Sequence, residues 1–315
     1  MDVSIVIPTR NRNELLSRTL RSALRQERVE FEIIVVDEAS TDDTPVLLAS
    51  LQDPRVRVLR HETARGLPGA RNHGAEHARG EWLGFLDDDD LWAPDKLNRQ
   101  VSAARAAGRD WSYTGAVNIA NGQIVHSGAT PAEEEVVSTV SRYPILPGGG
   151  SNVVVRRETF AAMGGFDSRL ANGGEDWELW IRLAEHGWPA GVLEPLVAKR
   201  VHASNMFGAT ERIVEAVTII QQLHGNPIDW RRMHRWLAER YAREGRWLSV
   251  ASELAKAAVL GELAAATVLL PHLRWRLRQT LGLRPAAARA SSDGRAAMAA
   301  AWLREFEDIE EATDV

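Results

Sequence analysis

The feature that most constrains this chain is the alternation, through its first third, of short apolar runs with segments of helical periodicity. Val3–Ile7 and Phe31–Val36 are almost wholly apolar, and shorter runs of the same kind follow at Val56–Leu59 and Leu83–Leu86. Short continuous apolar runs are typical of strands that are buried on both faces. Strands that alternate with helices favour a mostly parallel sheet with helices on both faces. The sequence therefore predicts an α/β, Rossmann-like fold.

The middle of the chain predicts further strands. Trp111–Ile119 and Gln123–His126 flank the dipeptide Asn121-Gly122 and predict a hairpin, because Asn-Gly supplies the positive φ angles of a tight turn. We expect another strand at Asn152–Val155 and a helix over Asp176–Glu185. These elements extend the sheet domain well beyond the alternating first third.

The composition changes after about Asn226, where Ala, Arg, Leu and Trp dominate and helical periodicity continues almost to the end of the chain. We therefore predict a sheet-containing domain over residues 1–226 and an α-helical C-terminal region over residues 227–315. Within the helical region we expect a disordered break at residues 285–295, where Ala, Arg and Ser are concentrated.

Charge and cysteine content exclude several classes of function. The formal net charge of −5 gives no overall case for nucleic-acid binding. The absence of cysteine excludes disulfides and cysteine-ligated zinc or iron–sulfur sites. The opening MDVSIVIPTRNR lacks the basic start and long apolar stretch of a secretory signal, and no run of about 18 apolar residues could form a membrane-spanning helix. We expect a cytoplasmic protein that does not bind nucleic acid.

Consecutive aspartates, Asp87 to Asp90, follow the fourth apolar run. Like charges this close repel one another unless a cation or hydrogen-bond donors offset them, and open α/β sheets bind ligands at the carboxyl ends of their strands. Magnesium or manganese usually takes one or two carboxylates and completes its shell with water and substrate phosphates. Asp87 and Asp89 would point the same way in an extended chain. A metal site is one interpretation, and a solvated loop whose Asp90 caps the next helix is the other.

Other segments could contribute to the same edge of the sheet. Asp37 and Glu38 end the second apolar run and could accept hydrogen bonds from a nucleobase or ribose, although such residues also form ordinary turns. Arg71, in a glycine-containing segment, suits bidentate contact with phosphate. Glu175 and Asp176 open a predicted helix, where one of them could be a general base or both could complement the helix N-terminus.

Histidines are less informative. None of the four in this set has a metal-ligand spacing such as HExxH, and we interpret them as surface or packed groups: His61, His73, His126 and His202.

The order of the informative segments carries more weight than any one of them. SIVIPTRNR, VVDEASTDDT, GLPGARNHGAEHARGEWLGFLDDDDLWAPDKL and GGFDSRLANGGEDWELWIRL together resemble the large family 2 of glycosyltransferases, which have the GT-A fold. The resemblance covers about residues 1–205 and stops before the helical C-terminal part. It implies that about residues 1–110 bind a nucleotide sugar and that about residues 111–226 form the acceptor side.

The resemblance also implies roles for individual residues. Those expected to bind the nucleotide are Pro8, Thr9, Asp37, Glu38, Arg71, Asp87 and Asp88. Asp87 and Asp89 are the expected metal ligands, with Asp89 the more direct, and Asp176 matches the catalytic base. Glu38 departs from the Asp, Asn or Gly that is common at its position, which leaves the nucleobase open. UDP is the commonest carrier in the family, and GDP, dTDP and CDP remain alternatives.

The reaction implied by the resemblance is a single displacement with inversion, assisted by Mn²⁺ or Mg²⁺. A sugar would pass from a nucleoside diphosphate to a hydroxyl acceptor, which could be a glycan, a lipid-linked sugar or a small molecule. A sugar-nucleotide nucleotidyltransferase is one alternative, but it should show a glycine-rich loop that SIVIPTRNR lacks. A non-catalytic sugar-nucleotide-binding scaffold is another, and the intact acidic run argues against it.

The C-terminal region carries a basic segment. From Leu263 to Ser292 there is no acidic residue, while arginines alternate with leucines. A basic amphipathic helix could rest on an anionic membrane, which predicts peripheral contact with the inner face of the membrane. The other interpretation is a helix packed on the catalytic domain or on a partner subunit.

Overall fold

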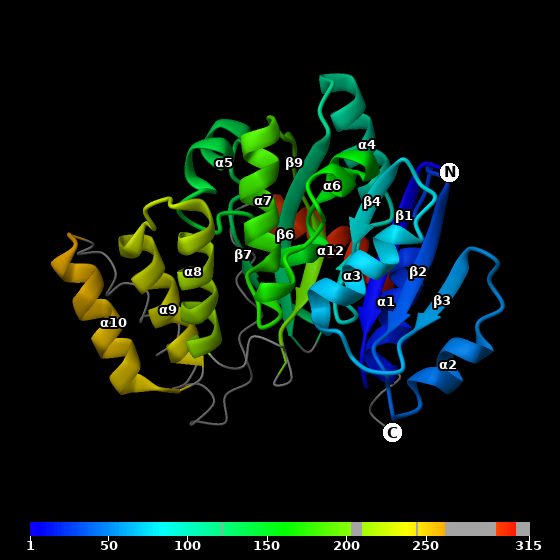
Figure 1. The fold of residues 1–315 in the computed structure, drawn as a ribbon, viewed down its shortest axis with the longest axis horizontal. Helices are drawn as coiled ribbons and strands as arrows, with labels where there is room; N and C mark the ends of the chain where they lie inside the picture. Colours follow the sequence, from blue (N-terminus) through cyan, green and yellow to red (C-terminus); the bar gives the residue numbers. More distant parts are fainter. Residues whose placement is uncertain (121, 203–209, 244, 262–293, 307–315) are drawn as a thin grey trace.

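The computed structural model describes residues 1–120, 122–202, 210–243, 245–261 and 294–306. A sheet of nine strands forms its centre, in the order β3-β2-β1-β4-β8-β6-β9-β5, with β7 paired to β6 (Figure 1). The strands are β1 Val3–Thr9, β2 Phe31–Asp37, β3 Val56–Arg60, β4 Trp82–Phe85, β5 Leu91–Trp92, β6 Trp111–Ala120, β7 Gln123–Ser127, β8 Val154–Arg156 and β9 Ala190–Arg200. The predicted α/β fold is confirmed.

Among the described strands the sheet is mixed, with four parallel and four antiparallel pairs. β1 pairs in parallel with both β2 and β4, and β2 pairs in parallel with β3. β8 is antiparallel to both β4 and β6, so β6 runs in the same direction as β4, and β9 is parallel to β6. The carboxyl ends of β1, β2, β4 and β9 therefore meet at one edge of the sheet.

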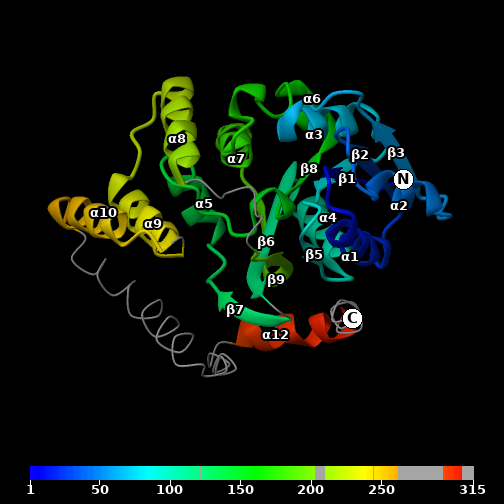
Figure 2. The same ribbon diagram turned by 90° about the horizontal axis from the view of Figure 1, so that it is seen from below.

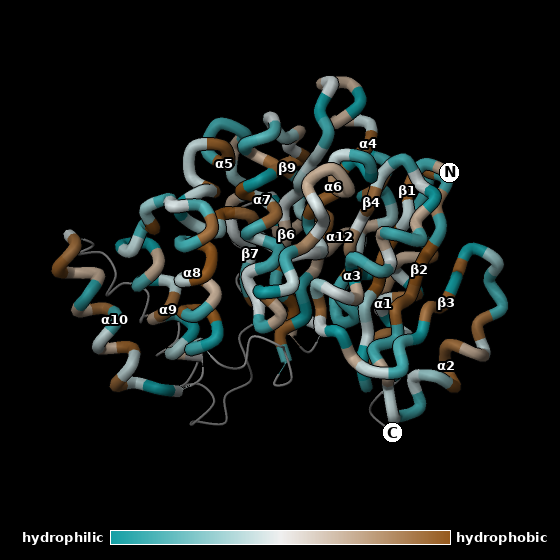
Figure 3. Tube along the Cα trace, viewed as in Figure 1, coloured by the Kyte–Doolittle hydropathy of each residue, from teal (hydrophilic) through white to brown (hydrophobic). Residues whose placement is uncertain are grey.

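Helices cover both faces of the sheet because successive strand residues point to opposite sides. Ile5 and Ile33 pack with α1 (Asn13–Leu24), α2 (Thr44–Ser50) and α4 (Lys96–Ala107). Val6 and Ile34 belong to the other buried cluster. The helices contributing to that cluster include α3 Gly66–Glu76, α5 Glu133–Thr139, α6 Arg157–Ala162 and α7 Glu175–His186. In Figure 3 hydrophobic stretches are seen in the strands, while the helices are mixed in colour.

The described part of the C-terminal region is helical, as the sequence predicts. α8 (Thr210–His224), α9 (Trp230–Arg243) and α10 (Trp247–Val259) extend from the side of the sheet domain next to α7, and α10 is outermost (Figure 1). Residues of α8 and α9 are buried in the same cluster as Trp177 and Trp180 of α7. Helices on both sides of the boundary predicted near residue 226 therefore share one apolar core.

The end of the described chain returns to the sheet. α12 (Gly294–Leu303) lies beside β7 and β9 in Figure 2. Trp302 donates a hydrogen bond of 3.0 Å from Nε1 to the carbonyl oxygen of Pro195 in β9. The basic segment Leu263–Ser292 lies outside the described residues. The expected break at residues 285–295 also lies outside them, except for its last two residues. Among the helices of the described ranges, none has the length and apolarity that crossing a bilayer requires.

Candidate active site

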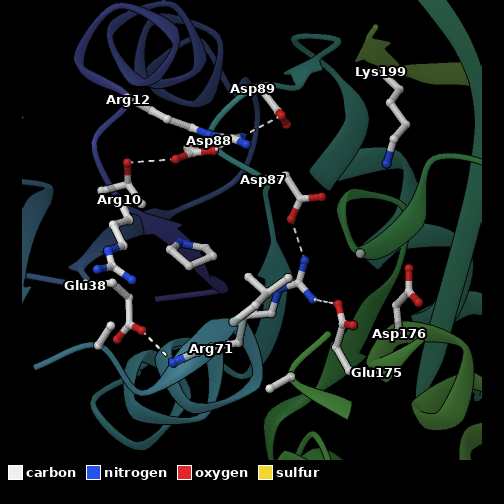
Figure 4. Close-up of a pocket in the computed structure, with 17 residues that line it drawn as sticks. Arg10, Arg12, Glu38, Arg71, Asp87, Asp88, Asp89, Glu175, Asp176 and Lys199 are labelled. Atoms are coloured by element: carbon white, nitrogen blue, oxygen red, sulfur yellow. Dashed lines mark hydrogen bonds and ion pairs between the residues drawn. The ribbon is translucent and has the colours of Figure 1, made fainter. Parts of the chain in front are cut away.

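A cleft opens at the edge of the sheet where the parallel strands end (Figure 4). Its volume is about 480 Å³. The residues that line it are Pro8, Thr9, Arg10, Arg12, Glu38, Ala64, Gly66, Leu67, Arg71, Asp87, Asp88, Asp89, Gly150, Ala171, Glu175, Asp176 and Lys199. Eight residues with an expected site role are therefore brought together from five separate segments of the chain.

The aspartates that follow β4 are not a solvated loop. Asp88, Asp89 and Asp90 are buried, and Asp87 is half-buried. The Asp90 carboxylate accepts hydrogen bonds from Ser151 Oγ at 2.7 Å and from the backbone N–H of Arg200 at 3.3 Å. Burial raises the pKa of Asp90 well above its ordinary value. The alternative in which Asp90 caps the next helix is wrong, because α4 begins at Lys96 and Asp95 occupies the N-cap position.

Arg12 neutralises part of the acidic run from the end of β1. Its guanidinium donates to Asp88 at 2.9 Å and to Asp89 at 2.7 Å, and the Thr9 hydroxyl donates to Asp88 at 2.8 Å. Burial raises the pKa of Asp88 to about 6 in spite of the Arg12 charge. For Asp89 burial is outweighed by the hydrogen bond with His202 and the Arg12 charge, and its pKa is lowered. The Nε2 of His202 lies 3.1 Å from Asp89.

The acidic run fits a divalent cation. Carboxylate oxygens of Asp87, Asp89 and Asp90 lie within 4.8 Å of one another. Asp87 and Asp89 line the cleft, whereas the oxygens of Asp90 are bound from behind. Two carboxylates that line the cleft, beside space for phosphate oxygens, match the donor set that Mg²⁺ or Mn²⁺ prefers. These residues therefore suit the metal role that the resemblance implies for Asp87 and Asp89.

Arg71 joins the tip of β4 to the start of α7. Its guanidinium is 1% exposed and donates to Glu175 at 2.6 Å, and also, at short range, to Asp87. Burial and the Asp176 charge raise the pKa of Glu175 to about 7. A Cβ on Gly150 would lie 2.4 Å from an Arg71 nitrogen, so the glycine leaves the space that the guanidinium occupies. Arg71 thus lines the cleft but is held by two carboxylates.

Asp176 and Lys199 lie on one side of the cleft, and Arg10 and Glu38 lie on the opposite side (Figure 4). Burial raises the pKa of Asp176, while the charges of Arg71 and Lys199 oppose this shift. A Cβ on Gly149 would meet Lys199 Nζ at 3.0 Å and Asp176 Oδ2 at 3.4 Å, which places both groups against the same glycine. Glu175 and Asp176 diverge as helical geometry requires, Glu175 to Arg71 and Asp176 into the cleft.

Asp37 is the last residue of β2 and Glu38 follows it, and of these two acids only Glu38 is among the described residues that line the cleft. Its Oε2 accepts the backbone N–H groups of Arg65 at 2.8 Å and Gly66 at 2.7 Å. Asp37 is buried elsewhere, where it accepts from the backbone N–H of Ser40 at 2.9 Å and from Arg60 at 2.6 Å. Of Asp37 and Glu38, the position in the structure therefore favours Glu38 as the residue that would contact the nucleobase.

Sequence reasoning missed three cations at the site. Arg10 and Arg12 follow the carboxyl end of β1, and their position in SIVIPTRNR was a usable signal. Lys199 is the penultimate residue of β9, and its approach to the acidic run depends on how β9 pairs with β6, which no local pattern reveals. His202 lacked a metal-ligand spacing, yet it lies at the same edge beside Asp89.

Solved structures share this architecture. TarS of S. aureus in complex with UDP-GlcNAc matches with a TM-score of 0.60 at 17% identity, over 91% of this chain and 93% of that chain. The mannosyltransferase PcManGT of Pyrobaculum calidifontis, in complex with GDP-Man and Mn²⁺, matches with a TM-score of 0.54 at 21% identity, over 88% and 84% of the two chains. The sheet, its helical layers and these neighbours define a protein with the GT-A fold.

Sequence comparison gives the family. A model described as Glycosyl transferase family 2 matches residues 4–136, and one described as Glycosyltransferase like family 2 matches residues 129–243. The chain belongs to family 2 of the glycosyltransferases, as its motifs predict.

Two curated relatives match over shorter stretches. Succinoglycan biosynthesis protein ExoO of Rhizobium meliloti is 46% identical over 107 residues, which are 34% of this chain and 31% of that protein. The glucosyltransferase WfgD of Escherichia coli is 33% identical over 129 residues, which are 41% of this chain and 51% of that protein. The matched stretches thus span between about a third and about half of the length of these relatives.

Proposed function

We propose that this protein transfers a sugar from a nucleoside diphosphate to a hydroxyl acceptor, with inversion at the anomeric carbon. One observation carries the proposal: the cleft brings the acidic run after β4 together with Asp176 at the start of α7, where the neighbouring Glu175 is held by Arg71. The acidic run suits a metal-bound diphosphate, and an acid of raised pKa that faces the cleft suits a general base. Membership of family 2 agrees with this division of roles.

The donor is expected to be a UDP-sugar. The full name of WfgD gives its donor as UDP-Glc, and TarS is in complex with UDP-GlcNAc, which favours UDP. PcManGT is in complex with GDP-Man, so GDP is the first alternative to test. Glu38 and the end of β1, at Pro8 and Thr9, form the wall assigned to the nucleoside.

Mn²⁺ or Mg²⁺ would be held by Asp87 and Asp89, and Asp88 would hold Thr9 and Arg12 in place beside them. The chemistry supplied there is neutralisation of the charge that develops on the leaving diphosphate. Lys199 and Arg12 add fixed positive charge beside the acidic run.

Asp176 accepts the hydroxyl proton while the acceptor oxygen forms its bond to the anomeric carbon. The bond from that carbon to the diphosphate oxygen breaks, and its electron pair leaves with the nucleoside diphosphate. Attack from the face opposite the leaving group inverts the configuration. Glu175 does not act on substrate in this scheme, because Arg71 holds it away from the acceptor side.

The acceptor is a hydroxyl on a glycan, a lipid-linked sugar or a small molecule. The full name of WfgD gives its acceptor as a GlcNAc-diphosphoundecaprenol, which favours a lipid-linked sugar as the acceptor here. An acceptor of that kind lies at a membrane surface, and peripheral contact through the basic segment Leu263–Ser292 would suit it.

The proposal is tested by incubating the protein with UDP- and GDP-sugars, Mn²⁺ and candidate acceptors. Acceptor-dependent release of nucleoside diphosphate, with the anomeric configuration of the product read by NMR, is the expected result. Release of pyrophosphate instead would identify a nucleotidyltransferase. Retained configuration would remove the single-displacement mechanism, and binding of nucleotide sugar with no turnover for any acceptor would indicate a scaffold.

A further inference from the structure

A second group of potential metal ligands lies on α3, outside the residues that line the cleft. His73, Glu76 and His77 follow the spacing H-x-x-E-H, the reverse of the HExxH order considered in the sequence. Residues three and four apart share one face of a helix. In the structure one potential metal-ligand atom from each residue lies within 4.8 Å of those of the other two. Glu76 and His77 are exposed and His73 is half-buried, so the group is open to solvent.

Hydrogen bonds fix the tautomer of His73 through a chain that begins in the cleft. Glu38 accepts two backbone N–H groups with one oxygen, and His61 Nδ1 contacts the other oxygen at short range. Because a carboxylate accepts, Nδ1 of His61 is the donor there, and in neutral His61 the Nε2 is then an acceptor. His73 Nδ1 lies 2.6 Å from that Nε2 and must donate to it. The Nε2 of neutral His73 is left with a free lone pair.

His77 is oriented in the same way. Its Nδ1 lies 2.9 Å from the backbone carbonyl oxygen of His73, which can only accept, so Nδ1 is the donor. The Nε2 of neutral His77 therefore also carries a lone pair. Histidines that bind metals characteristically donate their other N–H to a carbonyl, a carboxylate or a second polar group, which sets the ring orientation. His77, the residue that follows α3, meets this condition through a backbone carbonyl, and His73 is oriented through His61, whose own N–H is held by the Glu38 carboxylate.

We propose that His73, Glu76 and His77 bind a transition-metal ion, with zinc the best match. Imidazole nitrogens suit zinc and its neighbours and do not suit Mg²⁺ or Ca²⁺. Two histidines and one carboxylate leave a fourth tetrahedral position for water or another ligand, as in three-ligand zinc sites. His61 connects this site to Glu38 in the cleft, so the ion and the nucleoside wall share one hydrogen-bonded chain. The proposal does not depend on glycosyl transfer.

The test is zinc titration of the full chain after chelator treatment and dialysis, in the absence of nucleotide, with a chromophoric chelator as competitor. The wild-type protein is expected to bind one zinc ion that the variant His73→Gln/His77→Gln does not bind. Glu76→Gln should weaken zinc binding, and His61→Asn should weaken it by about 10–100-fold, the usual effect of removing a residue that orients a ligand. His126→Gln, an exposed histidine on β7, is the matched control and should bind zinc as the wild type does.

Two further measurements keep the outcome decisive. Thermal unfolding in chelator should be the same for the wild type and the double histidine variant, which shows that the fold is intact. Cobalt should give the visible spectrum of a tetrahedral nitrogen–oxygen site in the wild type and lose it in the double variant. The proposal is overturned if the wild type binds no zinc, if the double variant binds it equally well, or if Asp89→Ala rather than the histidine variants removes it.

Discussion

Arg71 donates a hydrogen bond of 2.6 Å to Glu175, a residue 104 positions further along the chain. The same guanidinium also holds Asp87, so one buried cation fastens the acidic run after β4 to the first turn of α7. These are the two parts of the cleft that carry the proposed metal ligands and the proposed base. Their separation is therefore set by an ion-pair network that runs across the sheet edge.

Replacing Arg71 by methionine should lower the free energy of unfolding. Removing one partner from a buried ion pair leaves an uncompensated charge and typically costs about 3–5 kcal/mol, and here two carboxylates lose their cation. The free energy of unfolding of Arg71→Lys should lie between those of the wild type and the methionine variant, because an ammonium cannot reproduce two directed contacts. Urea denaturation measures the effect. Arg79→Met replaces an exposed arginine and is the control, whose free energy of unfolding should stay within about 0.5 kcal/mol of the wild type. An equal loss of stability in Arg71→Met and Arg79→Met would show that the ion-pair network does not stabilise the fold.

Replacing Asp176 by asparagine should lower turnover by about 10²–10⁴-fold, the usual contribution of a general base. Asparagine keeps the shape of the side chain and can still accept the Trp177 N–H, so the start of α7 should persist. Donor affinity, measured by calorimetry with Mn²⁺, should change little. Glu185→Gln removes an exposed acid at the far end of the same helix and should leave turnover unchanged. A variant at Asp176 that keeps most of its activity would remove this residue from the role.

Much of the fold follows from local patterns. The apolar runs predict β1 to β4 to within two residues at either end. For β1, β2 and β4 the reason is that a buried parallel strand needs an uninterrupted apolar stretch, whereas β3 is only partly buried. The strand predicted at Asn152–Val155 is displaced to Val154–Arg156. Asn152 belongs to the preceding turn, where its amide bonds with the backbone of Thr114 and of Pro147. Because the Asn152 side chain bonds to the backbone across the sheet, the strand begins two residues later than hydropathy indicates.

The site is predictable in part for the same reason. Asp87 to Asp89 and Glu38 could be placed together because the carboxyl ends of parallel strands meet. The partners of these acids could not be predicted from the sequence. Arg12 bonds to Asp88 although the two residues are 76 positions apart, and no spacing rule links them. Lys199 is hidden for a different reason, because it lies in an otherwise ordinary strand.

Replacing Asp89 by alanine should abolish metal-dependent nucleotide binding. Asp89 lines the cleft and contributes an oxygen to the acidic group, whereas Asp90, bound from behind, cannot take its place. Calorimetry of UDP with and without Mn²⁺ should show a metal-dependent gain in affinity for the wild type that the variant lacks. Asp95→Ala, a half-buried acid on the protein surface just beyond the run, should keep that gain. Equal affinities with and without Mn²⁺ in the wild type would contradict the metal assignment.

The nucleotide-free protein should become more stable as the pH falls from 8 to 6. Burial together with the Asp176 charge raises the pKa of Glu175 to about 7, and burial raises that of Asp88 to about 6. In the unfolded chain both acids return to values of about 4. The folded protein therefore takes up protons in this window while the unfolded chain does not, and the free energy of unfolding rises by as much as about 1.4 kcal/mol for each pH unit and each proton. Thermal unfolding in chelator at pH 8, 7 and 6 measures the change, and Glu175→Gln should flatten it. A wild-type melting temperature that falls toward pH 6 would mean that these acids are already ionised without penalty in the free cleft.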